Sequence, residues 1–223
     1  MGETGLLALV GGAEWRPGAS FDAELLARSG GSRVLVLPTA AAYERPEKAI
    51  AWASEWFAGL GAEVEPLMVL WRQQAFEKAS CARAAAARFI YLGGGSPQHL
   101  RSVLAGSPLL DAIAGAWREG ASLAGSSAGA MALCDPMLDP GGGGLGPGLG
   151  VVSKLAIVPH HGQASPLLRR ALELAGPEVV VAGVPEQTAL LLDGERWRPA
   201  GAEVGRVALY KAGAEVGFEE LPV

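Results

Sequence analysis

The residues of this chain best suited to chemistry lie at 125–129, where the order Gly-Ser-Ser-Ala-Gly forms a G-x-S-x-G pattern around Ser127. An apolar run, residues 121–124, precedes the pattern, and a helix-prone stretch, residues 128–133, follows it. A strand, this pattern and a helix together are typical of a nucleophile elbow, in which glycines relieve the crowding of a very sharp turn. We therefore expect Ser127 to have a strained backbone and to act as a nucleophile. A plain strand-to-helix turn is the alternative.

A serine nucleophile needs a base, and the chain has three histidines. His160 and His161 follow a predicted strand at residues 155–158, whereas His99 lies in a predicted helix. The carboxyl ends of parallel strands meet at one edge of a sheet, which favours the pair over His99. Neighbouring residues on a strand point to opposite faces, so at most one of the pair faces Ser127. The same geometry, with no cysteine or carboxylate cluster nearby in the sequence, argues against a metal site.

The reaction also needs donors for an oxyanion and a carboxylate that orients the histidine. A glycine turn at residues 93–95 ends a predicted strand and can aim a backbone amide into the cleft, beside the amide of Ala128. An ordinary glycine-rich strand exit is the alternative. Glu186 follows another predicted strand, while Asp135 and Asp139 follow the elbow helix and compete with Glu186 for the role of the carboxylate.

Short apolar runs alternate with helical patterns along the chain, which predicts an α/β fold with a mostly parallel sheet flanked by helices on both faces. The later strands have short connections, which predicts an antiparallel edge. No interdomain linker is visible, so we predict a single domain over residues 1–223. The predicted strands are 6–10, 34–37, 62–69, 89–92, 121–124, 155–158, 179–184, 189–193 and 207–211, and the predicted helices are 21–28, 46–60, 73–87, 98–104, 108–119, 128–133 and 166–175.

Two segments have a structural and a functional interpretation. Trp52 and Trp56 lie one helical turn apart, and we interpret them as core packing rather than as part of a binding site. Residues 140–150 are dominated by glycine and join the elbow helix to the strand before the histidines. This segment fits two interpretations: a flexible surface loop, or a mobile flap beside the site.

Composition narrows the class of protein. The chain has 223 residues, half of them hydrophobic, and its net charge of −5 without a basic run argues against a nucleic-acid partner. Two cysteines, Cys81 and Cys134, cannot form a disulfide framework, which fits a reducing cytoplasm. The apolar run at residues 6–10 is too short for a signal peptide or a membrane span. We expect a cytoplasmic protein without a cofactor, metal or membrane contact; its oligomeric state is not determined by these features.

Several segments taken together resemble the S51 peptidases, the dipeptidase E and cyanophycinase group. That family is built on the class I glutamine amidotransferase-like fold, which is flavodoxin-like. The resemblance covers most of the chain, and the segments occur in the family's order: GGAE at 11–14, GGGSPQ at 93–98, GSSAGA at 125–130, VPHH at 158–161 and GVPEQTA at 183–189.

The resemblance implies roles for single residues. Ser127 matches the nucleophile, His160 the base, Gly95 and Ala128 the oxyanion-hole amides and Glu186 the carboxylate, with His161 and Asp135 as alternatives. The function implied is a serine hydrolase that cleaves small peptides through an acyl-enzyme, with Asp-X dipeptides as one open substrate class. A non-catalytic binding module on the same fold and a small-molecule esterase are the alternatives.

The chain also departs from the family pattern. Ser96 stands where family members often carry asparagine, and no arginine follows the histidines before Arg169. The cyanophycinase pattern has several arginines close behind its histidine, so degradation of the arginine–aspartate polymer is poorly supported. The enzymes that hydrolyse glutamine on this fold use cysteine in the elbow, so serine argues against a thiol glutaminase.

Overall fold

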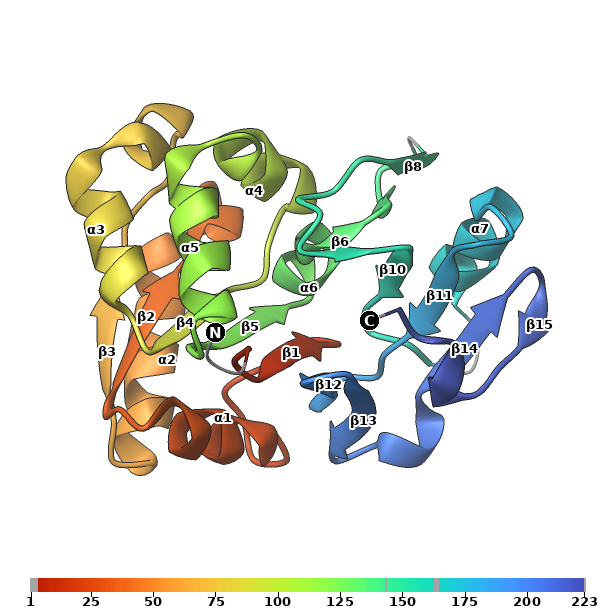
Figure 1. Ribbon diagram of the computed structural model, residues 1–223, viewed down its shortest axis with the longest axis horizontal. Coiled ribbons are helices and arrows are strands. Elements are labelled where there is room, and N and C mark those ends of the chain that lie inside the picture. Colours follow the sequence, from red (N-terminus) through yellow and green to blue (C-terminus); the bar gives the residue numbers. More distant parts are fainter. Residues whose placement is uncertain (1–3, 143, 163–164, 223) are drawn as a thin grey trace.

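The computed structural model describes residues 4–142, 144–162 and 165–222. Its larger sheet has seven strands in the order β13-β12-β1-β5-β4-β2-β3 (Figure 1). The five strands from β1 to β3 in this order are parallel to one another, whereas β12 pairs antiparallel with both of its neighbours, β1 and β13. This arrangement confirms the predicted mostly parallel sheet with an antiparallel edge. The strands are β1 (Leu7–Val10), β2 (Arg33–Leu37), β3 (Glu63–Pro66), β4 (Phe89–Leu92), β5 (Ser122–Ser126), β12 (Thr188–Asp193) and β13 (Arg196–Gly201).

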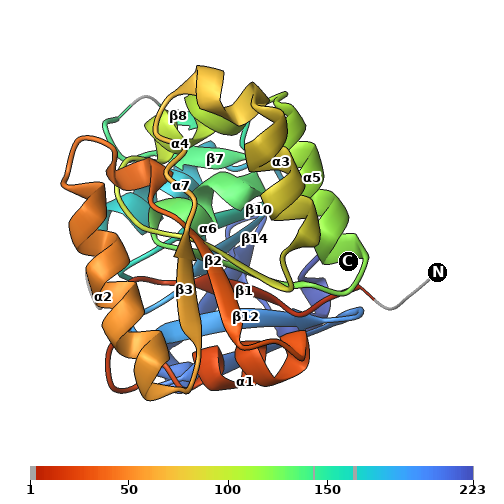
Figure 2. The ribbon, with the colours of Figure 1, turned by 90° about the vertical axis from the view of Figure 1, so that its left-hand side faces the viewer.

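Helices cover both faces of this sheet (Figure 2). Strand β1 shows why: Leu7 and Leu9 pack into one hydrophobic cluster, whereas Ala8 and Val10 pack into the other. Side chains of α1 and α2 complete the second cluster, and those of α4, α5 and α6 belong to the first. The helices are α1 (Phe21–Ser29), α2 (Pro46–Gly59), α3 (Lys78–Ala86), α4 (Pro97–Leu104), α5 (Pro108–Arg118) and α6 (Ala128–Leu133), with short 3₁₀ turns η1 (Thr39–Ala41) and η2 (Arg72–Phe76).

A second sheet has four strands in the order β10-β11-β14-β15. The alternation of strands and helices in the sequence did not predict that these strands form a separate sheet. Alternation shows where strands occur, but not which strands pair with one another. Helix α7 packs against β10 and β11. The elements are β10 (Leu155–Val158), α7 (Pro166–Leu174), β11 (Val180–Gly183), β14 (Ala208–Lys211) and β15 (Ala214–Glu215), with the 3₁₀ turns η3 (Val204–Arg206) and η4 (Phe218–Glu220).

The glycine-rich segment at residues 140–150 contains regular structure. Strand β8 (Gly144–Gly146) pairs antiparallel with β7 (Met137–Asp139), and β6 (Cys134–Asp135) pairs with β9 (Val152–Ser153) just outside the segment. Gly143 lies outside the described residues. The segment is therefore in part a small hairpin rather than a plain loop.

Three expectations from the sequence need correction. The predicted helix at 73–87 is divided, because Glu77 is extended between η2 and α3. Strand β13 was not predicted; it contains Pro199, which an edge strand tolerates because one side of its ladder needs no partner. Trp52 is 51% exposed, so its assignment to the core is wrong, whereas Trp56 packs partly buried against the core.

Within the described residues, no helix is long and apolar enough to cross a membrane. The same residues contain no group of three or more His, Cys, Asp or Glu side chains that could hold a metal ion. Both cysteines are free, and burial raises the pKa of the Cys134 thiol, which keeps it protonated.

Candidate active site

The turn between β5 and α6 has the geometry of a nucleophile elbow. Ser127 adopts φ 49° and ψ −106°, a conformation that confirms the expected backbone strain. A Cβ on Gly125 would lie 2.6 Å from the carbonyl carbon of Gly129. A Cβ on Gly129 would in turn lie 2.4 Å from the oxygen of Leu92 at the end of β4. Both glycines are therefore required by close backbone contacts, as the sequence pattern indicated.

His160 lies beyond the end of β10 and reaches Ser127 across the gap between the two sheets. Its Nε2 is 2.9 Å from the Ser127 Oγ. The backbone of His160 has φ 52°, an uncommon conformation for a residue with a side chain, and its amide donates to the Gly11 oxygen at 2.7 Å. That hydrogen bond ties the histidine to the end of β1, next to the elbow strand β5.

Glu186 lies beyond the end of β11, on the other side of the His160 ring. Its Oε1 is 2.9 Å from the His160 Nδ1. Both side chains are about half exposed, at 49% for His160 and 59% for Glu186. The structure thus brings Ser127, His160 and Glu186 into one chain of hydrogen bonds, although 33 and 26 positions separate the bonded pairs in sequence.

The loop after β1 joins the two sheets at this point. The Gly12 oxygen accepts from the Gln187 amide at 2.8 Å, directly after Glu186. A Cβ on Gly12 would lie 2.2 Å from the Cε1 of His160, so only glycine leaves room for the ring. We did not assign a role to Gly11 and Gly12 from the sequence. Their position directly after the first strand, where parallel strands present functional groups, was the signal that could have found them.

The glycine turn after β4 leaves one backbone amide available. Within the described residues the amide of Gly95 has no hydrogen-bond partner, and neither has that of Ala128 at the start of α6. Gly95 has φ 133°, and a Cβ there would lie 2.3 Å from the Ala40 oxygen. The neighbouring amides are occupied: Gly93 donates to Leu37 O at 3.1 Å, Gly94 to Glu14 Oε1 at 3.2 Å and Ser96 to Ala40 O at 2.8 Å.

Glu14 connects the glycine turn to the elbow. Its Oε1 accepts from the Gly94 amide at 3.2 Å, and its Oε2 accepts from the Ser126 hydroxyl at 2.6 Å. Gly94 precedes Gly95, whose amide is free within the described residues, and Ser126 precedes Ser127, the candidate nucleophile. Glu14 was also missed by the sequence reasoning, which noted its segment without giving it a role.

The other candidates of the sequence analysis have different partners. The His161 ring packs on Gly183, where a Cβ would lie 2.8 Å from its Cγ. Burial, and to a smaller extent the charge of Arg206, lowers the pKa of His161. Asp135 accepts from the Gly148 amide at 2.8 Å through its Oδ1. Asp139 accepts from the Gln98 side chain and from the Gly141 amide, and His99 bonds the Leu70 oxygen at 2.8 Å.

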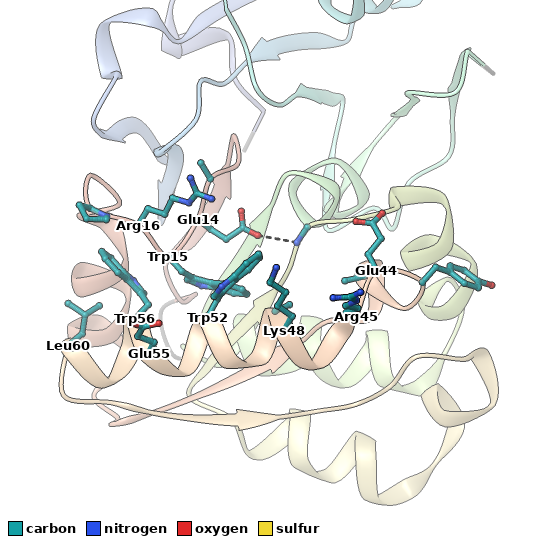
Figure 3. Close-up of a pocket in the computed structure, with 17 residues that line it drawn as sticks. Glu14, Trp15, Arg16, Glu44, Arg45, Lys48, Trp52, Glu55, Trp56 and Leu60 are labelled. Carbon is teal, nitrogen blue, oxygen red and sulfur yellow. Dashed lines mark hydrogen bonds between the residues drawn. The ribbon is translucent and has the colours of Figure 1, made fainter.

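A cavity of about 1040 Å³ opens beside this site (Figure 3). Glu14 and Gly94 belong to its lining, as does one face of α2 with Lys48, Trp52 and Trp56. The cavity is large enough for a small organic molecule or a peptide.

Comparisons with known proteins show which proteins this chain resembles. A cyanophycinase from Synechococcus elongatus and one from Thermosynechococcus vestitus are each 27% identical over 207 residues, which is 87% of this chain and 64% of theirs. The chain thus spans less than two thirds of the length of these curated relatives.

Two solved structures have the same fold. The crystal structure of a peptidase from an acI-B1 Actinobacterium superposes with a TM-score of 0.83 at 28% identity, covering 97% of this chain and 98% of that one. A candidate peptidase E from Listeria monocytogenes EGD-e gives 0.69 at 18% identity, over 90% and 100% of the two chains. The model of peptidase family S51 matches residues 7–199. The chain belongs to peptidase family S51.

Proposed function

We propose that this protein hydrolyses small peptides through a Ser127–His160–Glu186 triad and an acyl-enzyme. One observation carries the proposal: Ser127 Oγ, the two nitrogens of His160 and Glu186 Oε1 form a continuous chain with both contacts at 2.9 Å. Serine hydrolases on unrelated folds share this arrangement.

The contacts assign a role to each group. Glu186 accepts from Nδ1–H of His160, which leaves Nε2 as the acceptor for the Ser127 proton. Ser127 then attacks the carbonyl carbon of the substrate, and His160 passes the proton to the leaving amine. Water hydrolyses the resulting ester with His160 again as base, which restores the Ser127 hydroxyl.

We propose that the amides of Gly95 and Ala128 hold the oxyanion. Both amides are free within the described residues, whereas the other amides of the glycine turn are occupied. One such donor contributes about 3 kcal/mol to transition-state stabilisation. Glu14 would act as a positioning residue, because it holds the two segments that carry these amides at a fixed separation. This role depends on the bonds of Glu14 to the Gly94 amide and the Ser126 hydroxyl rather than on contact with substrate.

We propose peptides that carry a carboxylate, with Asp-X dipeptides among them, as substrates. Arg16, Arg45 and Lys48 line the cavity next to the site and supply cations for such a group. Glu44 and Glu55 line the same cavity, so a cationic group on the substrate also finds a partner there.

A fluorophosphonate probe tests the nucleophile directly. We expect it to label the wild-type protein and to leave Ser127→Ala unlabelled, with a loss of peptidase activity of at least about 10⁴-fold. Thermal unfolding of the variant serves as the control for folding. Absence of labelling in the wild type would contradict the mechanism. Substrate binding without turnover, unchanged in Ser127→Ala, would support a non-catalytic binding module, and faster cleavage of esters than of amides would support an esterase.

A further inference from the structure

The cavity adjoins the proposed active site, although Ser127, His160 and Glu186 do not belong to its lining. Glu14, which lines it, also contacts the hydroxyl of Ser126, the residue before the nucleophile. A Cβ on Gly94, another lining residue, would lie 3.6 Å from the Cβ of Ser127. Glu14 and Gly94 therefore place the cavity next to the elbow, and a peptide bound in the cavity must extend past them to reach Ser127.

The length of the cavity exceeds that of a dipeptide. The face of α2 that lines it runs from Lys48 to Gly59. Eleven steps along a helix at 1.5 Å each give a wall of about 16 Å. An extended peptide rises about 3.3 Å per residue, so roughly five residues span this wall and a dipeptide covers less than half of it.

The wall carries a half-exposed aromatic ring. Trp52 is 51% exposed and points from α2 toward the cavity, which Trp15 and Lys48 also line (Figure 3). The Lys48 ammonium lies 4.6 Å from the centre of the Trp52 ring, which orients the indole. An indole held in this way offers an apolar surface on which an aromatic side chain gains energy by stacking.

The charged side chains around the cavity do not favour ligands of one sign of net charge over the other. Three cations and three anions line it, and within residues 4–142, 144–162 and 165–222 none of the six forms an ion pair within 4.0 Å: Arg16, Arg45, Lys48, Glu14, Glu44 and Glu55. Both signs of charge suit a peptide with free termini and mixed side chains. Length and aromatic character then distinguish substrates better than charge does.

We propose that the cavity binds the non-reacting part of an oligopeptide substrate of about five residues, with an aromatic side chain stacked on Trp52. This inference rests on the proposed function, since it assigns the substrate class of that site. A dipeptide bound at the triad covers less than half of the α2 wall. Contacts remote from the reacting bond can be used to orient that bond, so the longer substrates are cleaved with the higher kcat/KM.

The test compares peptides that share one scissile bond. Asp-Ala is the short substrate, and it is extended on either side as Asp-Ala-Gly-Phe-Gly and Gly-Phe-Gly-Asp-Ala, each with a version in which alanine replaces phenylalanine. We expect at least one phenylalanine pentapeptide to exceed Asp-Ala by about 10-fold or more in kcat/KM at the Asp-Ala bond. Trp52→Ala should lower that value about 10-fold and should have a much smaller effect on the version in which alanine replaces phenylalanine. Phe76→Ala is the matched control, since Phe76 is 48% exposed but does not line the cavity.

Calorimetric binding of the pentapeptides to Ser127→Ala separates this inference from the proposed function. Binding that depends on phenylalanine and on Trp52, without turnover by the wild type, would support the binding groove and overturn the hydrolase. Turnover of all peptides at equal kcat/KM, unaffected by Trp52→Ala, would overturn the groove and leave the hydrolase in place. Equal effects of Trp52→Ala and Phe76→Ala would also overturn it.

Discussion

The two halves of the candidate site are built differently. The elbow half belongs to the seven-stranded sheet and is buried: Ser126 is 0% and Ala128 1% exposed, and glycine contacts fix the turn. The histidine half follows β10 and β11 of the smaller sheet, and the side chains of His160 and Glu186 are about half exposed. The loop after β1 bonds to both parts of this half, through Gly11 to the His160 amide and through Gly12 to the Gln187 amide.

This difference indicates where the geometry is sensitive to change. A buried turn between packed strands resists displacement because many contacts would be lost together. The half-exposed side chains have fewer contacts and depend on the backbone bonds that hold their loops. We therefore expect the histidine half to be easier to misalign without unfolding the protein.

The largest effect short of removing the nucleophile is expected for Glu186→Gln. The amide of glutamine can donate to the histidine and stabilise the tautomer that cannot accept the Ser127 proton, so kcat should fall about 10²- to 10⁴-fold. Steady-state hydrolysis of a peptide measures the loss. Asp135→Asn is the matched control and should change kcat less than about threefold. A comparable loss in that variant would show that Asp135, rather than Glu186, orients the base.

Gly12→Ala tests the joint between the halves. The added methyl would lie 2.2 Å from the His160 Cε1, so the ring must move away from Ser127 and kcat should fall about 100-fold. Gly61→Ala is the control, since Gly61 also has a positive φ but no atom within 4 Å of the added methyl. It should destabilise the protein by about 1 kcal/mol without loss of kcat. Equal kcat in wild type and Gly12→Ala would contradict the proposed joint.

Glu14→Gln tests whether the elbow half needs its connection to the glycine turn. Glutamine places an NH2 group where Glu14 has one of its oxygens, so either the Gly94 amide loses its acceptor or the Ser126 hydroxyl must reverse its hydrogen bond. The connection between the two segments of the proposed oxyanion hole is then weaker, because neither bond is to a charged group. We expect kcat to fall about 10-fold with KM nearly unchanged, and binding of a peptide boronate to weaken by a similar factor. Glu44→Gln, in the same cavity, should change neither. A change confined to KM would instead indicate direct contact between Glu14 and substrate.

Substitution of Asp22 should change the free energy of unfolding of the protein and should not change kcat. Asp22 lies fully buried in the first turn of α1, accepts from Trp56 Nε1 at 2.9 Å, and burial raises its pKa from 3.8 to about 8. Between these pH values the folded protein keeps a proton that the unfolded chain has released. The free energy of unfolding should therefore fall as pH rises from 4 to 8, by up to about 1.4 kcal/mol per unit, and level off above.

Urea unfolding of wild type and Asp22→Asn at several pH values measures this dependence. The asparagine keeps an acceptor for Trp56 but does not titrate, so the variant should lose this part of the pH dependence. Parallel curves for the two proteins would contradict the raised pKa.

Local patterns were sufficient for some features of the molecule. The alternation of apolar runs and helical segments predicted the order of most elements, and G-x-S-x-G between a strand and a helix predicted the strained elbow at Ser127. These features depend mainly on near neighbours in the chain: the crowding of Gly125 against Gly129 is a property of the turn itself, whereas Gly129 also contacts Leu92 of β4.

Other features depend on contacts between distant segments, which only the tertiary structure decides. The pairing of β10 with β11 in a separate sheet, the place of Gly12 against the His160 ring and the bonds of Glu14 to Gly94 and Ser126 have no local sequence signal. Trp52 follows the same helical spacing as a core residue, yet it is 51% exposed and lines a cavity. Spacing along a helix fixes which residues share a face, but the packing of the whole chain decides whether that face is buried.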